Sequence, residues 1–305
     1  MPRPIVKRSL VRVRGAWRDH DVRARTAAAR AWRAVRLGAV AARMRSPEVA
    51  IIECRRGADV SGLFSEVAAV IGFLDHYDRW QHLYAGVRVD FNDGLYYEPA
   101  VGTNWWNYYF EPIDIGGHGA PERVVNPHYH DLCANRVERR LPRHTGAALV
   151  ARYVRANPVV RDLADAFVRD HWRGAHVIGV HYRGTDKQED APRVPYERMA
   201  EVVRKAMTGM PESRVFLATD EAAFVDYMDS AFLGRVAYRR MFRSADGRPI
   251  DVVNADGNHQ KGLDAVLDCV LLSRTNFLIR TASNLSLCAT LFNARLPEML
   301  LNPER

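Results

Sequence analysis

Segments with the pattern of buried strands alternate with segments with the pattern of helices along most of this chain, and this alternation limits its fold more than any other feature. A strand is expected at 49–54, followed by a glycine-containing loop at 57–62 and a helix at 63–80. A longer series begins at 175, with strands expected at 175–181, 214–219, 236–238, 276–279 and 298–301 and helices between them that end at 207 or cover 221–232, 262–272 and 284–293. Strands that alternate with helices form parallel sheets covered on both faces, so an α/β protein is predicted.

A helical, arginine-rich segment at 131–172 separates the two series, and Pro158 is expected to divide it into two helices. In the first series, a second strand is expected at 87–90, and the aromatic loop at 91–112 is expected either to fill a core or to line a ligand cleft. Two series joined in this way predict two Rossmann-like domains, which cover 48–165 and 166–305 and follow a tail at 1–47. Ligands of such domains bind in the crevice outside the carboxyl ends of the strands.

The positive charge of the chain is concentrated in this tail. The net charge is +8, but residues 1–47 contain thirteen Arg and Lys and two Asp, which leaves the rest of the chain with a net charge of −3. A body without a basic excess argues against nucleic-acid binding. Residues 28–43 have an amphipathic helical pattern, and three interpretations stay open: a solvated extension, a helix that docks on an anionic membrane or acidic partner, and an organellar transit peptide.

Apolar stretches and cysteines bear on the compartment. The longest apolar stretches fall far short of the roughly 20 residues of a transmembrane helix, and the first residues lack the apolar region of a secretory signal. The four cysteines form no CxxC pair, which favours a reducing compartment. We therefore expect a cytoplasmic location, peripheral to the inner membrane if the tail binds lipid.

Charged and polar side chains follow the expected strands of the second series. The residues at the end of the strand at 175–181 include His181, Arg183, Asp186 and Lys187. Three potential cations at the ligand-binding edge of a sheet suit a diphosphate, and a surface loop held by ion pairs is the alternative. The next strand ends at Thr219 and Asp220, either of which can cap the following helix.

Two further segments of the second series suit a nucleotide. The helix at 262–272 carries Asp264 and Asp268 on one face, and a buried carboxylate there needs a donor, which the edge of a guanine could supply. The last helix opens at 281–285, where its free N–H groups form an anion site.

Several runs of sequence resemble the motifs of one enzyme superfamily. The run HYRGTDK at 181–187 looks like the HxRxTDK signature of the GDP-fucose-dependent fucosyltransferases, which include α-1,6-, α-1,2- and protein O-fucosyltransferases. Its two downstream motifs are similar to ATDE at 218–221 and to LDCVLLS at 267–273 with TASN at 281–284. In the first half, GLFSE at 62–66 and NWWNYYFEP at 104–112 resemble segments of the nodulation-type enzymes. The resemblance covers about residues 48–302.

The resemblance implies a GT-B-like fold, with an acceptor-side domain at 48–165 and a nucleotide-sugar-binding domain at 166–305. It implies an inverting transfer of fucose from GDP-fucose to a glycan or another acceptor hydroxyl. His181 and Arg183 would contact the β-phosphate, and Asp268 would bind guanine. The other residues expected on the donor side are Gly62, Asp186, Asp220, Ser283 and Asn284, of which the last two would hold phosphate oxygens.

Two positions depart from the family pattern. Gly184 stands where many relatives have a second arginine, so the leaving group has one cation fewer. Ala191 stands where the α-1,6 enzymes have a glutamate base, and Glu189 and Asp190 are the nearest candidates for that role.

The resemblance also implies how the reaction is helped. Arg183 and Lys187 would stabilise the negative charge on the departing diphosphate. No metal cofactor is expected, because the only DxD sequence is formed by Asp19 and Asp21 in the tail. A transferase with another nucleotide sugar and a catalytically silent nucleotide-sugar-binding protein remain as alternatives.

Overall fold

The computed structural model describes residues 47–54, 61–127, 141–185, 191–210, 212–248, 250 and 256–303. The second half of the chain forms a five-stranded sheet in the order β7-β6-β5-β8-β9, in which every neighbouring pair is parallel. Its strands are β5 (Val177–Tyr182), β6 (Arg214–Thr219), β7 (Val236–Ala237), β8 (Phe277–Arg280) and β9 (Glu298–Leu300). All five fall where the alternation of strands and helices predicts them.

The register of this sheet brings the carboxyl ends of its central strands to one edge. His181 on β5 pairs with Ala218 on β6 and with Arg280 on β8. The polar residues that follow these strands in the sequence therefore start from the same edge of the sheet, which is where ligands of such sheets bind.

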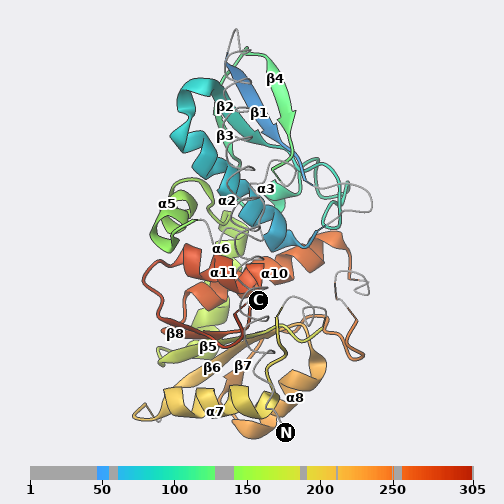
Figure 1. The fold of residues 1–305 in the computed structure, drawn as a ribbon. Helices are drawn as coiled ribbons and strands as arrows, with labels where there is room; N and C mark the ends of the chain where they lie inside the picture. The colour runs from blue at the N-terminus through green and yellow to red at the C-terminus, as the bar shows by residue number, and fades with distance from the viewer. Residues whose placement is uncertain are drawn as a thin grey trace, which may run out of the picture. The chain divides into compact units, whose positions relative to one another are not determined.

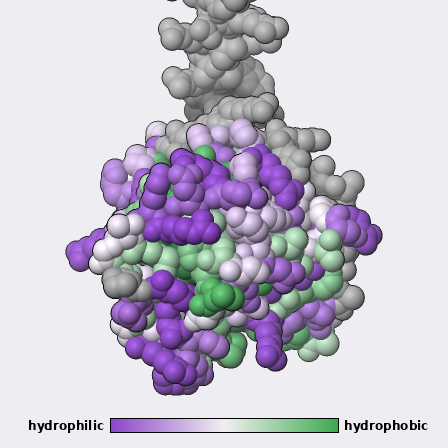
Figure 2. All heavy atoms as spheres, turned by 90° about the horizontal axis from the view of Figure 1, so that it is seen from below, coloured by the Kyte–Doolittle hydropathy of each residue, from purple (hydrophilic) through white to green (hydrophobic). Residues whose placement is uncertain are grey.

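Helices cover both faces of the sheet (Figure 1). Successive side chains of a strand point to opposite faces, and Ile178 and Val180 of β5 share a core with α7 (Tyr196–Met207) and α8 (Ala222–Ala231). Val177 belongs instead to the larger core that contains residues of α10 (Asn258–Ser273) and α11 (Asn284–Phe292). Seen from below (Figure 2), hydrophilic and hydrophobic side chains are interspersed on the surface.

The first half of the chain forms a smaller sheet in the order β3-β2-β1-β4. Its elements are β1 (Glu48–Ile52), α2 (Leu63–Arg79), the 3₁₀ turn Gln81–Leu83, β2 (Tyr84–Val89), β3 (Asp114–Gly116) and β4 (Glu122–Val125). β4 pairs with β1 in parallel, but β3 pairs with β2 antiparallel, so the prediction of parallel strands throughout is wrong for this edge. β3 and β4 are short and partly exposed, and they lack the apolar run by which the other strands are detected.

The aromatic loop at 91–112 fills the core of the first half. It contains the short helix α3 (Trp106–Tyr109), and Trp105, Trp106, Tyr109 and Phe110 are each at most 1% exposed. The core-filling interpretation is therefore confirmed for these four side chains.

The arginine-rich connection contains α5 (Arg143–Tyr153), α6 (Pro158–Phe167) and a π-helical turn at Val168–Trp172. Pro158 is the first residue of α6, and the Asn157 side chain accepts a hydrogen bond from Val160 N at 3.0 Å, so the predicted division into two helices is confirmed. Both sheets belong to one compact unit, Val49–Arg305, and the domain boundary expected near residue 165 stays a prediction. Residues 1–46, to which the hypotheses about the tail apply, lie outside the described residues. Within the described ranges, no helix is long and apolar enough to cross a membrane.

Candidate active site

A cavity of 310 Å³ lies at the carboxyl edge of the five-stranded sheet, and residues of the first half of the chain form part of its wall. Seven of the predicted site residues line it: Gly62, His181, Arg183, Asp220, Asp268, Ser283 and Asn284. The other four, Asp186, Lys187, Glu189 and Asp190, lie outside the described residues. A larger hollow of 470 Å³ beside α7 and α8 is lined by none of the seven.

The Asp220 carboxylate organises the loop that follows β5. It accepts hydrogen bonds from Gly184 N at 2.9 Å and from Thr185 Oγ1 at 2.8 Å, and the Arg183 guanidinium lies 3.1 Å away. The Asp220 side chain is only 4% exposed, so its carboxylate interacts with these protein groups rather than with water. Asp220 therefore does not cap α8, whose N-terminus has no side-chain cap, and that interpretation of Asp220 is wrong.

Gly184 has no room for a side chain. A Cβ atom there would lie 2.0 Å from Glu221 Oε2 and 2.9 Å from Tyr182 Cε1. Glu221 is held in place by Arg193, whose Nη2 lies 2.8 Å from its carboxylate. An arginine at position 184, as many relatives have, would require Glu221 to move, so the missing cation reflects how this loop is packed.

His181 is buried in the wall of the cavity and is neutral at physiological pH. Burial, together with the positive charges of Arg183 and Arg280, lowers the pKa of His181 to about 3. The expectation that it adds a third cation is therefore wrong. Its Nδ1 atom has no hydrogen-bond partner among the described residues, so a neutral imidazole is available to donate or accept a hydrogen bond in the cavity.

The two carboxylates of α10 differ in their partners. Asp264 accepts hydrogen bonds from Arg239 Nη2 at 2.7 Å and from Gln260 Nε2 at 3.0 Å. Asp268 is 4% exposed, its Oδ1 has no hydrogen-bond partner among the described residues, and Arg239 Nη1 lies 3.8 Å from that atom. Burial raises the pKa of Asp268 to about 6, although Arg239 and Arg243 favour the charged form. Only Asp268 therefore offers an unused buried acceptor to a ligand.

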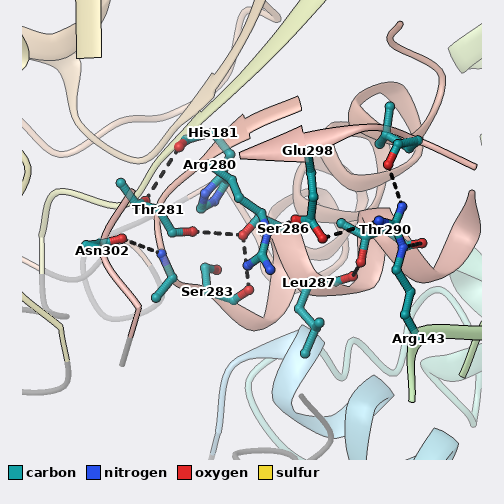
Figure 3. A network of polar contacts seen from close by, with 12 residues as sticks. Arg143, His181, Arg280, Thr281, Ser283, Ser286, Leu287, Thr290, Glu298 and Asn302 are labelled. Carbon is teal, nitrogen blue, oxygen red and sulfur yellow. Dashed lines mark hydrogen bonds and ion pairs between the residues drawn. The ribbon is translucent and has the colours of Figure 1, made fainter. Parts of the chain in front are cut away.

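The turn between β8 and α11 is fixed by a network of hydrogen bonds (Figure 3). Thr281 N donates to His181 O at 3.0 Å, and Thr281 Oγ1 accepts from Arg183 N at 2.9 Å. Ser286 Oγ donates to Thr281 O at 2.9 Å, which ties the first turn of α11 to the same residue. Ser283 caps the helix by accepting from Leu285 N at 3.2 Å, so its hydroxyl proton remains available to a ligand.

Two residues of the cavity wall were not predicted as site residues, namely Tyr96 of the aromatic loop and Lys261 of α10. Tyr96 Oη accepts a hydrogen bond from Leu63 N at 2.9 Å, next to Gly62 at the start of α2. Lys261 also lines the cavity and is 7% exposed. Its spacing of three and seven residues before Asp264 and Asp268 was the available signal, because residues three and seven apart share a helix face.

The described residues contain no cluster of three or more His, Cys, Asp or Glu side chains that could hold a metal ion. The ligand-binding groups that line the cavity are a guanidinium, an ammonium, a neutral imidazole, the N–H groups at the start of α11 and a buried carboxylate on α10. Such a set can bind an anion and a hydrogen-bond donor within the same ligand.

Comparisons with known proteins show which family the chain resembles. The model of the nodulation protein Z (NodZ) family matches residues 133–305. Nodulation protein Z of Bradyrhizobium diazoefficiens (strain USDA 110) is 26% identical over 167 residues, which are 50% of this chain and 44% of that protein. The match thus spans less than half the length of that curated relative.

Solved structures have the same fold. The fucosyltransferase NodZ from Bradyrhizobium matches with a TM-score of 0.57 and 18% identity, over 85% of this chain and all of that one, as does NodZ α-1,6-fucosyltransferase soaked with GDP-fucose. POFUT1 in complex with GDP-fucose matches with a TM-score of 0.52 and 11% identity, over 85% and 99% of the two chains. The prediction of a GT-B-like α/β fold is confirmed.

Proposed function

The chain belongs to the nodulation protein Z family, and from that premise we propose that it transfers fucose from GDP-fucose to a hydroxyl group of a glycan or another acceptor, with inversion at the anomeric carbon. The observation that carries this proposal is the cavity itself. It combines the buried Asp268 carboxylate, whose Oδ1 has no hydrogen-bond partner among the described residues, with an anion-binding group formed by Arg183, His181 and the start of α11.

The Asp268 carboxylate suits a guanine base. Guanine presents N1–H and a 2-amino group side by side, and a carboxylate can accept a hydrogen bond from both. Uracil presents a single ring N–H, so it leaves part of this acceptor capacity unused. A guanine bound at Asp268 would satisfy the Oδ1 atom that has no protein partner among the described residues.

The anion-binding group suits the leaving diphosphate. As the bond between fucose and the β-phosphate breaks, its electron pair moves to the phosphate oxygen, where negative charge builds. The Arg183 guanidinium lies 3.1 Å from the Asp220 carboxylate, and the Arg183 backbone N donates to Thr281 Oγ1, so the guanidinium is positioned before the reaction. Neutral His181 would donate a hydrogen bond, and Ser283 and Asn284 at the N-terminus of α11 would bind further phosphate oxygens.

A carboxylate takes the proton from the acceptor hydroxyl in this scheme. Glu189 and Asp190 remain the candidates for this base, and Lys187 and Asp186 remain candidates on the donor side, on the grounds of sequence alone. Ala191 is 4% exposed and has no ionisable group, so it cannot serve in that role. The identity of the glycan acceptor would be set by residues around the cavity that belong to the first half of the chain.

The proposal is tested with nucleotide sugars and an assay for released GDP. GDP-fucose and GDP should raise the melting temperature more than UDP-sugars, because a ligand that binds only the folded protein stabilises it. GDP release from GDP-fucose with oligosaccharide acceptors should continue in excess chelator, since we propose that no metal takes part. Equal stabilisation by UDP-sugars would favour another donor, and GDP binding without turnover on any acceptor would favour a silent binding protein.

Replacing Asp268 with asparagine should weaken GDP binding by about tenfold or more, the usual effect of losing a hydrogen bond to a charged group, and should change UDP binding much less. The amide offers one acceptor oxygen where the carboxylate offers two. Titration calorimetry with both nucleotides measures the ratio. Asp264→Asn is the matched control. Asp264 is already bound by Arg239 and Gln260, so this variant should keep the preference for GDP over UDP. Wild-type protein that binds GDP and UDP equally would contradict the assignment.

The affinity for GDP should fall as the pH is lowered through about 6. Protonation of Asp268, whose pKa is raised to about 6, removes an acceptor for the hydrogen bonds of the guanine.

The stability of the unliganded protein should change in the opposite direction with pH. The pKa of Asp268 in the folded protein lies above the ordinary aspartate value of 3.8, so the folded state binds the proton more tightly. The contribution of this group to stability is therefore lost as the pH rises from about 4 to 6. Both trends should disappear in Asp268→Asn, as followed by calorimetry and thermal unfolding, and persistence of either in that variant would assign it to another group.

The tail and the location of the protein rest on the sequence alone. We propose a cytoplasmic enzyme whose basic residues 1–47 attach it to the periphery of an anionic membrane or to an acidic partner. Equal cosedimentation of full-length and truncated protein with anionic vesicles would contradict the attachment to a membrane.

A further inference from the structure

The first turn of α10 brings a buried lysine into the cavity. Lys261, Asp264 and Asp268 all line it, and their spacing of three and seven residues places them on one face of the helix. Lys261 is 7% exposed. Its Nζ lies 3.2 Å from Asn258 Oδ1 and 5.6 Å from the centre of the Tyr96 ring. The ammonium group is thus next to the cavity wall that the first half of the chain provides.

The position of this lysine is fixed by the aromatic loop. Glu98 Oε2 accepts a hydrogen bond from His259 N at 2.8 Å, and Tyr97 O accepts one from Asn258 Nδ2 at 2.9 Å. The Tyr109 hydroxyl donates to His259 O at 2.9 Å, and the two rings stack with an interplanar angle of 13°. These contacts hold the first turn of α10, so Lys261 is presented to the cavity by a rigid element.

The contact with Tyr109 also leaves no room for a side chain at position 262. A Cβ atom on Gly262 would lie 2.1 Å from Tyr109 Oη, so the residue after Lys261 must be glycine for the loop to pack this closely. Lys261 adds an ammonium group to the Arg183 guanidinium among the positively charged side chains that line the cavity.

A nucleoside diphosphate sugar brings two negative charges into this cavity. Lys261 and Asp268 are about 10 Å apart along the axis of α10. A nucleotide whose base binds to Asp268 can therefore extend its phosphates toward other charged groups of the cavity. We propose that Lys261 is a donor-binding residue that contacts the diphosphate of the nucleotide sugar, in addition to Arg183. This inference rests on the proposed function, because it assumes that the donor carries a diphosphate.

The test compares ligands that share the base but differ in charge. Lys261→Met should weaken GDP binding by about ten- to a hundredfold, as expected for losing a hydrogen bond to a charged group, and should leave guanosine binding unchanged. Lys261→Arg keeps the charge and should retain part of the GDP affinity. Lys205→Met is the matched control, because Lys205 is 71% exposed on α7, pairs with Glu201 and lies away from the cavity. It should bind both ligands like wild type.

The possible results separate this inference from the proposed function. Wild-type protein that fails to bind GDP would overturn both. GDP binding by wild type with unchanged affinity in Lys261→Met would overturn the inference alone. An equal loss of GDP and guanosine affinity in Lys261→Met would also overturn it, because a lysine that merely supports the shape of the cavity would affect the base and the diphosphate alike.

Discussion

Replacing Arg183 with alanine is expected to lower the turnover of GDP-fucose by about 10²- to 10³-fold, the usual effect of removing one preorganised donor from a transition state. Charge builds on the diphosphate as the glycosidic bond breaks, so the guanidinium stabilises the transition state more than the bound donor. Position 184 is a glycine and adds no second cation, so stabilisation of the charge on the diphosphate depends more strongly on Arg183. Turnover at saturating GDP-fucose, measured as released GDP, gives the effect on the chemical step.

Arg183→Lys is the control for charge. It should recover only part of the turnover, because an ammonium group retains the positive charge but lacks the planar, two-pronged geometry of the guanidinium. A role in ordering the loop would give a different result. In that case Arg183→Ala would melt at a lower temperature while the folded protein turned over normally at saturating donor, and the catalytic role would be rejected.

The centre of the second sheet could be predicted from the sequence because its strands are buried on both faces. Such strands are continuous apolar runs between amphipathic helices, and β5, β6 and β8 follow that pattern. The sheet in the first half has an antiparallel edge strand and a strand, β4, with only one buried residue. Their pairing depends on main-chain hydrogen bonds with neighbours that no local pattern reveals. The start of α10 at Asn258, before the expected 262, depends likewise on a distant residue, because Glu98 binds its first turn.

The site could be located from the sequence, but the partners of its charged groups could not. Five of the seven predicted residues that line the cavity lie at or just after the ends of β5, β6 and β8, which the register aligns; Gly62 lies at the start of α2 and Asp268 on α10. Asp264 and Asp268 look alike in the sequence. Only the structure shows that Arg239 and Gln260 donate hydrogen bonds to Asp264, whereas Asp268 Oδ1 lies 3.8 Å from Arg239 and has no hydrogen-bond partner among the described residues. Lys261 was missed because its importance comes from burial beside Tyr96, which is far away in the chain.

Replacing Asp220 with alanine should lower turnover by about as much as replacing Arg183, that is about 10²-fold or more, although Asp220 is a positioning residue. Its buried carboxylate serves Gly184 N, Thr185 Oγ1 and the Arg183 guanidinium at once, so its removal leaves these groups without their common acceptor. Removing one partner of a buried ion pair typically costs about 3 to 5 kcal/mol, so the free energy of unfolding should fall as well. Denaturant unfolding and released GDP measure the two effects.

A double-mutant cycle distinguishes positioning from an independent role of Asp220. If Asp220 acts through Arg183, the double variant Arg183→Ala/Asp220→Ala should lose scarcely more turnover than Arg183→Ala alone, because the group that Asp220 positions is already gone. Asp220→Asn sharpens the comparison, since the amide keeps the size of the side chain and one acceptor oxygen and should therefore retain more stability than Asp220→Ala. Losses that multiply in the double variant would mean that Asp220 affects turnover without Arg183, and the positioning role would have to be abandoned.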